Sequence, residues 1–155
     1  MSKICCFAGH REIYQADRIT DEIIRICERL IIEDNVTEFM VGNYGRFDLC
    51  AKIAVERLKD KYPGIKLLLV IPYLTASIIK DKNINNEYDE IIIADIPKTT
   101  PNRYKIIKCN EYMIKKADYL ICYITVNWGG AYKTVEYAKK QKNIIIYNLG
   151  NLTIY

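Results

Sequence analysis

The stretch that decides the fold is residues 3–9, Lys-Ile-Cys-Cys-Phe-Ala-Gly. It is a continuous apolar run that ends at a glycine, a pattern typical of a strand buried on both faces of a sheet. Apolar side chains then recur at spacings of three and four over residues 16–33, which predicts an amphipathic helix. A buried strand followed by a helix is the first half of a βαβ unit, so this opening predicts a parallel sheet.

The same alternation continues to the end of the chain. Further strands are predicted at residues 38–41, 65–71, 88–94, 119–124 and 143–147. Further helices are predicted at residues 47–62, 103–117 and 131–141, with a partial helix and a loop at 73–88 and room for an edge strand at 148–155. This order predicts an α/β fold, a doubly wound, mainly parallel, Rossmann-like sheet with helices on both faces. We expect a single domain over residues 1–155, because no linker or repeat interrupts the pattern.

The charge and hydropathy of the chain narrow the class of protein. The 23 basic and 19 acidic residues give a net charge of +4, and the basic residues are dispersed. A weakly positive surface suits an anionic small molecule, whereas a nucleic-acid groove needs clustered charge, so we expect nucleic acid not to be a partner. No apolar run is long enough for a membrane span or a signal peptide. We therefore expect a cytoplasmic protein with no membrane partner.

Six cysteines and one histidine are present, and no Cys-x-x-Cys spacing occurs. These numbers argue against a zinc site, so we expect no metal. Cysteines that lie in apolar strands and helices of a reduced compartment pack as small hydrophobic residues. We therefore expect buried free thiols.

In open α/β sheets, ligands bind at the carboxyl ends of the strands, so the residues after each strand carry the functional information. The first strand is followed by Gly9, His10 and Arg11. Glycine permits a tight turn and close backbone approach, and the two side chains offer donors to an anion. By itself this short motif fits a plain strand-to-helix turn with exposed side chains even better.

The turn after the second strand is Gly42-Asn43-Tyr44-Gly45, and Asp48 follows it in the first turn of the next helix. Two glycines three residues apart before a helix suit a phosphate that is bound by backbone N–H groups. Asp48 has two interpretations of about equal weight. Its carboxylate binds ribose hydroxyls, or it only favours the positive end of the helix dipole.

The turn after the fifth strand contains Trp128, Gly129 and Gly130, with Thr134 and Glu136 in the first two turns of the following helix. A double glycine at a helix start leaves backbone N–H groups free for an anion. Glu136 is placed to reach a sugar, or it is a solvated helix residue. Trp128 stacks on a base, or it anchors the loop.

Several common motifs are missing. The sequence contains no G-x-x-x-x-G-K-[ST] loop, no G-x-G-x-x-G and no G-x-S-x-G. These absences argue against a P-loop NTPase, a dinucleotide-binding protein with the usual glycine fingerprint and a hydrolase with a nucleophile elbow. Any triad that uses histidine would have to use His10.

Taken together, residues 5–11, 42–48, 103–113 and 129–138 resemble the SLOG superfamily, Rossmann-like domains named for their relation to the Lonely Guy phosphoribohydrolases and DNA-processing proteins. The closest likeness is to the YpsA-like branch, whose members begin with a strand that ends in Gly-His-Arg. Arg103 and Asn110 resemble the residues on an Arg/Asn-bearing helix of that family. The resemblance implies a pocket for nucleotides or nucleotide-derived signals such as ADP-ribose, and some branches cleave the N-glycosidic bond of nucleoside monophosphates.

The chain departs from the cleaving relatives at one place. Their Gly-Gly turn carries a Gly-Thr pair followed by glutamates, whereas Tyr132-Lys133 stands here and Thr134 falls one place later. We therefore expect binding of a nucleotide or an ADP-ribose-like ligand at the carboxyl edge of the sheet, without a cofactor and in a homo-oligomer. Two alternatives remain open. One is a nucleotide N-glycosidase with Glu136 as its catalytic group, and the other is a sensor or sponge that sequesters a cyclic ADP-ribose-type signal.

Overall fold

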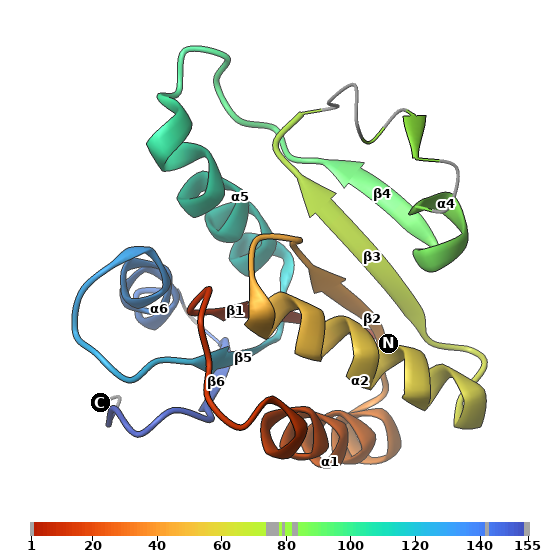
Figure 1. Cartoon of the computed structure of the whole chain (residues 1–155). Helices are drawn as coiled ribbons and strands as arrows, with labels where there is room; N and C mark the ends of the chain where they lie inside the picture. Colours follow the sequence, from red (N-terminus) through yellow and green to blue (C-terminus); the bar gives the residue numbers. More distant parts are fainter. Residues whose placement is uncertain (1, 74–77, 79, 82–83, 142, 154–155) are drawn as a thin grey trace.

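A parallel sheet forms the centre of the structure (Figure 1). The computed structural model describes residues 2–73, 78, 80–81, 84–141 and 143–153. Within these ranges the sheet has six strands, β1 (Lys3–Gly9), β2 (Val36–Val41), β3 (Lys66–Ile71), β4 (Glu90–Ile93), β5 (Tyr119–Tyr123) and β6 (Ile145–Asn148). Their order is β4-β3-β2-β1-β5-β6, and every neighbouring pair is parallel.

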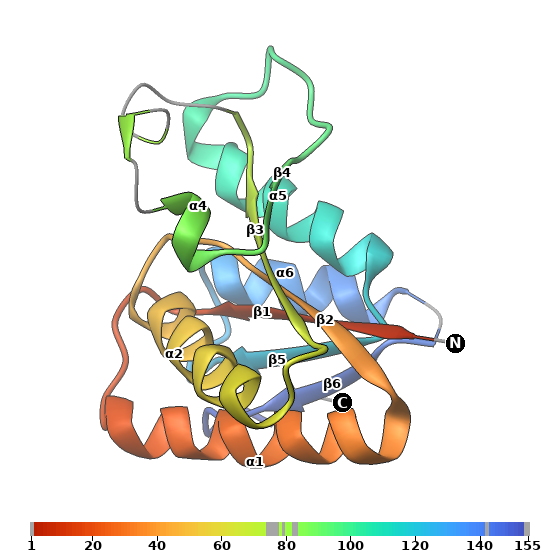
Figure 2. The same ribbon diagram turned by 90° about the vertical axis from the view of Figure 1, so that its right-hand side faces the viewer.

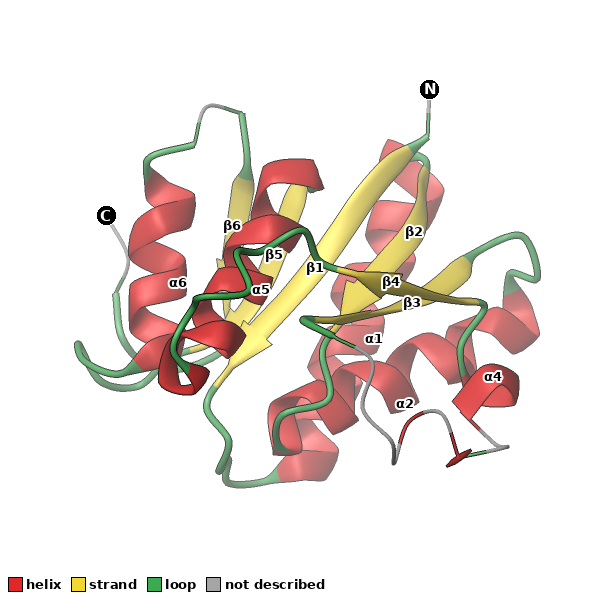
Figure 3. Ribbon diagram, turned by 90° about the horizontal axis from the view of Figure 1, so that it is seen from above, coloured by secondary structure: helices red, strands yellow, loops and turns green. Residues whose placement is uncertain are grey.

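Helices cover both faces of this sheet, as Figures 2 and 3 show. The helices among the described residues are α1 (Ala16–Asp34), α2 (Arg46–Lys61), α4 (Ile84–Glu87), α5 (Asn102–Lys116) and α6 (Gly130–Lys139). Helices α1 and α2 pack on one face, and α5 and α6 pack on the other. The predicted doubly wound, Rossmann-like α/β fold is therefore confirmed.

Two apolar layers hold the helices to the sheet, because successive strand residues point to opposite faces. In β1, Cys5 and Phe7 pack with the α1 and α2 side, whereas Cys6 and Ala8 pack with the α5 and α6 side. All four side chains are buried, which explains the continuous apolar run at the start of the sequence.

The cysteines are buried free thiols, as expected. Burial raises the pKa of both the Cys109 and the Cys122 thiol to about 12. A thiol with so high a pKa stays protonated at neutral pH and is a poor nucleophile or metal ligand. These two thiols therefore serve packing.

The bounds of the elements differ from the predicted ones at several places, among them β4 and β6, which each begin two residues later than predicted. Strand β2 begins two residues earlier than predicted, because Asn35 ends α1 in the left-handed conformation (φ 56°) and the chain turns directly into the sheet. The described part of the tail, residues 149–153, forms no strand. Gly150 is instead pressed against the backbone of Ile124, where no Cβ atom would fit. The partial helix predicted at 73–88 appears as the short α4, while residues 74–77, 79 and 82–83 lie outside the described ranges.

The order of the strands reverses at β1. The chain moves from β1 through β2 and β3 to β4 on one side, and it then places β5 and β6 on the other side. At such a switch point the connections after the two neighbouring strands diverge to opposite faces and leave a crevice at the carboxyl edge. Here the crevice lies where β1 and β5 end side by side, with Gly9 paired to Tyr123.

Within the described part of the chain, no helix has both the length and the apolar character needed to cross a membrane.

Gly9 provides a test of how closely β1 and α2 approach each other. A Cβ atom at Gly9 would lie 2.5 Å from Cγ of Phe47, whose side chain is fully buried. We expect Gly9→Ala to lower the free energy of unfolding by about 1–3 kcal/mol in urea titrations, because the Phe47 ring must shift within a packed core. The matched control is Gly64→Ala, where the added Cβ meets nothing within 4 Å, and we expect a change below about 1 kcal/mol. Equal unfolding free energies for the two variants would contradict the close packing.

Candidate functional site

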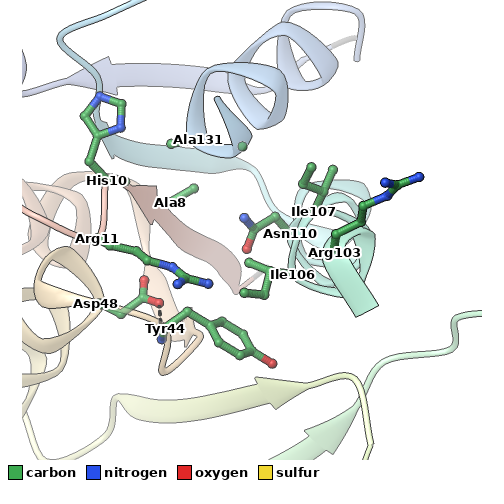
Figure 4. Close-up of a pocket in the computed structure, with 13 residues that line it drawn as sticks. Ala8, His10, Arg11, Tyr44, Asp48, Arg103, Ile106, Ile107, Asn110 and Ala131 are labelled. Atoms are coloured by element: carbon green, nitrogen blue, oxygen red, sulfur yellow. Dashed lines mark hydrogen bonds between the residues drawn. The ribbon is translucent and has the colours of Figure 1, made fainter. Parts of the chain in front are cut away.

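A cavity of about 330 Å³ opens at the switch point, on the carboxyl edge of the sheet. This volume lies in the range of small-molecule binding sites. The residues that line it are Ala8, Gly9, His10, Arg11, Tyr44, Gly45, Asp48, Arg103, Ile106, Ile107, Asn110, Gly130 and Ala131 (Figure 4).

Four segments far apart in the sequence meet at this cavity. They are the end of β1 with its following loop, the β2–α2 turn, helix α5 and the start of α6. They converge because the strands are parallel, so that all their carboxyl ends lie at one edge of the sheet. Helix α5 enters from the α6 side and closes the cavity opposite the β2–α2 turn (Figure 4).

Most of the ligand-binding residues predicted from the sequence come together here. Those that line the cavity are Gly9, His10, Arg11, Tyr44, Gly45, Asp48, Arg103, Asn110 and Gly130. Those that are not among the lining residues are Gly42, Asn43, Trp128, Gly129, Thr134 and Glu136.

Arg11 provides the main positive charge of the cavity. Its guanidinium extends toward the centre of the lining residues in Figure 4, and none of the ion pairs among the described residues includes it. Its backbone carbonyl accepts a hydrogen bond from the Arg46 N–H at 2.9 Å, which fixes the loop against the start of α2. Arg11 is thus an unpaired cation on an anchored loop.

Gly45 is required for this anchoring. A Cβ atom at Gly45 would lie 2.6 Å from Cα of Arg11, so only glycine lets the α2 terminus come this close. Gly9 is needed for a similar reason, because a Cβ atom there would collide with the ring of Phe47. Both glycines therefore have a packing role that is independent of any ligand.

The side chain of Asp48, in the first turn of α2, folds back onto the β2–α2 turn, where the sequence predicted a phosphate. Its Oδ2 accepts a hydrogen bond from the Tyr44 N–H at 3.0 Å, and a Cβ atom at Gly42 would lie 3.1 Å from the same oxygen. Burial raises the pKa of the Asp48 carboxyl to about 6, although the Tyr44 N–H acts to lower it. An anionic phosphate in this turn would meet a carboxylate, so the turn is better suited to a hydroxyl donor.

The start of α6 offers the free backbone donors. Gly129 has φ 93°, a left-handed conformation that favours glycine, and no side chain caps the helix. The helical hydrogen bonds begin with the Lys133 N–H, which donates to the Gly129 carbonyl at 3.0 Å. The N–H groups of Gly130 and Ala131 precede that bond, and both residues line the cavity.

Thr134 has a positioning role. Its side chain is fully buried, its hydroxyl donates to the Gly130 carbonyl at 3.0 Å, and it accepts from Nδ2 of Asn110 at 3.2 Å. These bonds tie α5 to the first turn of α6. Thr134 therefore helps to shape the cavity without lining it.

Helix α5 contributes an apolar wall that the sequence analysis missed. Arg103, Ile106, Ile107 and Asn110 all line the cavity and follow the i, i+3, i+4, i+7 spacing of one helix face. In the sequence the two isoleucines have the spacing of ordinary apolar positions of this helix. The sequence did contain a signal that this helix face lines a cavity. The isoleucines share the face with Arg103 and Asn110, and a core-facing stripe does not normally carry an arginine and an amide.

Glu136, the catalytic candidate of the glycosidase hypothesis, is separated from the cavity. It lines a smaller hollow beside Lys139, with which it forms an ion pair of 3.3 Å. Six residues of α-helix rotate a side chain by about 240°, so Glu136 cannot share the direction of Gly130. The helix geometry places the carboxylate on a different side of α6.

Trp128 and Arg103 are turned outward. The Trp128 side chain is 69% exposed on the β5–α6 loop. The Arg103 guanidinium stacks on the ring of Tyr104 at 4.9 Å and points away from the other lining residues in Figure 4. Arg103 therefore lines the rim of the cavity with its stem.

Comparisons with known proteins support the fold. No protein-family model matches the sequence. The chain is 27% identical over 139 residues, which is 79% of this chain and 81% of the other protein, to the uncharacterized SPbeta prophage-derived protein YoqJ of Bacillus subtilis (strain 168).

Two solved structures have the same fold at 14% identity. DNA processing protein A (DprA) from Streptococcus pneumoniae matches with a TM-score of 0.61 over 94% of this chain and 49% of that chain. DprA from Helicobacter pylori, which binds single-stranded DNA, matches with a TM-score of 0.58 over 93% of this chain and 64% of that chain. The chain thus spans about half of the first protein and less than two thirds of the second.

One expectation from the sequence is wrong. Dispersed charge was taken to argue against a nucleic-acid partner, yet a protein with this fold binds single-stranded DNA. A single strand can be held by a few cations and by base stacking, without the clustered charge that a duplex groove needs. Nucleic acid therefore belongs among the partners to be tested.

The buried carboxyl of Asp48 predicts an unusual dependence of stability on pH. Its pKa is raised from 3.8 to about 6 in the folded chain, so the folded state binds more protons than the unfolded state between these values. Stability contributed by Asp48 is therefore present below pH 4 and is lost as the pH rises to 6. We expect Asp48→Asn to be more stable than the wild type at pH 7.5 by about 2 kcal/mol, and to lose this advantage near pH 4. Urea unfolding at both pH values measures this, with the exposed Asp21→Asn as control, and a pH-independent difference would contradict it.

Proposed function

We propose that the cavity binds a nucleotide, either free or as one unit of a single-stranded nucleic acid. The observation that carries this proposal is the convergence of three groups at one switch-point cavity. These groups are the unpaired guanidinium of Arg11, the uncapped start of α6 and the buried carboxyl of Asp48. Together they match the phosphate and the sugar of a nucleotide.

The phosphate end of the ligand is assigned to the α6 side. Backbone N–H groups at a helix start and the helix dipole both favour an anion, and Gly130 and Ala131 present such groups at the cavity. Arg11 adds a planar fork of donors that suits phosphate oxygens. The Asp48 carboxyl lies at the α2 turn, so its charge would repel a phosphate placed on that side.

The sugar end of the ligand is assigned to Asp48. Only Oδ2 accepts a hydrogen bond from a described residue, so Oδ1 is available to the ligand. An ionised carboxylate is purely an acceptor, and the hydroxyl groups of a ribose are donors. The base would then lie along Ile106 and Ile107, with the Tyr44 ring as a surface for stacking.

The order of the glycine turns and the fold shared with DprA support a further proposal, that this chain is a member of the SLOG superfamily. Assignment to the YpsA-like branch stays a prediction from residues 5–11. The ADP-ribose ligand that the resemblance implied has no independent support, and it enters only as one compound in the test. Cleavage of the ligand is not proposed, because Glu136 lies away from the cavity.

Isothermal titration with AMP, ADP-ribose, inorganic phosphate and a 12-nucleotide single-stranded DNA tests the binding proposal. We expect AMP to bind, and we expect Arg11→Ala to weaken its binding by about 10- to 100-fold, the usual loss for a charge-assisted hydrogen bond. The control is Arg25→Ala, which removes an exposed arginine of α1 that does not line the cavity.

The compounds separate the two sources of the nucleotide. Binding of the oligonucleotide at lower concentrations than AMP, with the same loss in Arg11→Ala, would identify nucleic acid as the source. Binding of AMP alone would identify a free nucleotide. No binding of any compound by the wild type, or equal losses in Arg11→Ala and Arg25→Ala, would contradict the proposal.

A further inference from the structure

The ring of His10 is bound by the backbone of the neighbouring loop. The Thr125 N–H donates a hydrogen bond to Nε2 of His10 at 3.0 Å. A ring nitrogen that accepts a hydrogen bond carries no proton. The neutral ring must therefore carry its proton on Nδ1, because the hydrogen bond at one nitrogen sets the tautomer of the other.

Other contacts hold the ring in this place. The backbone N–H of His10 donates to the Tyr123 carbonyl at 3.3 Å, and the two rings meet edge to face with their centroids 6.0 Å apart. These contacts extend the β1–β5 pairing by one residue beyond Gly9 and Tyr123. If the imidazole turned over about its Cβ–Cγ bond, it would lose the hydrogen bond from the Thr125 N–H.

The donor of this hydrogen bond is equally restrained. Ile124, the residue before Thr125, donates its N–H to Oδ1 of Asn148 at 2.9 Å, and its carbonyl accepts from Nδ2 of Asn148 at 3.2 Å. Asn148 thus holds the start of the β5–α6 loop from the β6 side, while His10 holds it from the β1 side. These bonds position the Thr125 N–H for its hydrogen bond to Nε2 of His10.

The charge state of the ring follows from its surroundings. Partial burial lowers the pKa of His10. The other charged and titratable groups of the cavity lining are Arg11, Asp48 and Tyr44, together with Arg103, whose guanidinium points away from the cavity, and Tyr123 lies against the ring. Protonation would also place an N–H of the ring against the Thr125 N–H. The ring is therefore neutral at neutral pH.

The second ring nitrogen is free. No described residue forms a hydrogen bond with Nδ1, and His10 lines the cavity near Ala131 of α6 (Figure 4). A donor of fixed direction thus remains unused at the end of the cavity that offers the α6 N–H groups.

We propose that His10 is a specificity-determining residue of the nucleotide site, locked by Thr125 as the neutral Nδ1–H tautomer so that it donates one hydrogen bond to a phosphate oxygen of the ligand. This inference rests on the proposed function. In this assignment Arg11 attracts the phosphate by its charge, and His10 donates a hydrogen bond of fixed direction. The imidazole acts as a donor while it stays neutral.

The tautomer is testable without a ligand, because His10 is the only histidine of the chain. Long-range proton–nitrogen NMR spectra of the ¹⁵N-labelled, tag-free protein at pH 7 contain a single imidazole. We expect a protonated-type shift for Nδ1 and an unprotonated-type shift for Nε2. A protonated Nε2, or one averaged shift for both nitrogens, would overturn the inference.

Two substitutions separate the two nitrogens of the ring. In His10→Gln the amide oxygen can replace Nε2 as acceptor for Thr125, but the Nδ1 donor is lost. In His10→Asn the amide nitrogen can replace Nδ1, but the bond to Thr125 is lost. We expect His10→Gln to weaken AMP binding by about threefold to tenfold, the usual loss for a neutral hydrogen bond, and His10→Asn to weaken it less. Thermal melts verify that both variants fold.

Titration of the wild type with AMP distinguishes this inference from the proposed function. We expect AMP to shift the Nδ1 signal and to leave the Nε2 signal nearly unchanged. Binding of AMP with an unchanged Nδ1 signal, or with full affinity in His10→Gln, would overturn the His10 inference alone. Absence of AMP binding by the wild type would overturn the proposed function, and the ligand role of His10 with it.

Discussion

Strand β1 is hydrogen-bonded to β2 on one side and to β5 on the other, and its central side chains are buried on both faces. The rest of the structure depends on this central position. A strand with two apolar faces must be covered by helices on both, and the strand order reverses at β1 because β2 follows it on one side and β5 is added on the other. The reversal creates the crevice at the end of β1, so burial of the strand and location of the cavity have the same cause.

Close packing around this strand changes the role of the glycine turns. Gly9 makes room for Phe47, and Gly45 makes room for the backbone of Arg11. Both contacts fasten α2 to the end of β1, and the Arg46 N–H completes the attachment. Glycines that resemble a phosphate cradle in the sequence are thus used for protein packing, and the α6 turn keeps free donors.

The charges in the cavity are arranged by solvation and hydrogen bonding. Arg11 is free of ion pairs among the described residues, while burial raises the pKa of Asp48 to about 6. His10 is neutral because its Nε2 is taken by a backbone donor. The cation of Arg11, the carboxyl of Asp48 with its raised pKa and the neutral ring of His10 are therefore each held by their own local contacts. In the proposed function, this arrangement distinguishes the phosphate end of the ligand from the sugar end.

The sequence by itself determined the order of strands and helices and the turns that carry functional residues. Apolar periodicity is a local property, and parallel strands bring their carboxyl ends to one edge whatever their order. Gly9 and Tyr44, which follow two of these strands, could therefore be predicted to lie near one site, whereas Asn110 was expected there only from the resemblance to the SLOG superfamily. Only the tertiary structure decided which side chains face the cavity. The direction of Glu136 depends on the rotation of α6, and the wall formed by Ile106 and Ile107 depends on how α5 docks. The tautomer of His10 depends on Thr125, which lies 115 residues away in the chain and meets it only when β5 pairs with β1.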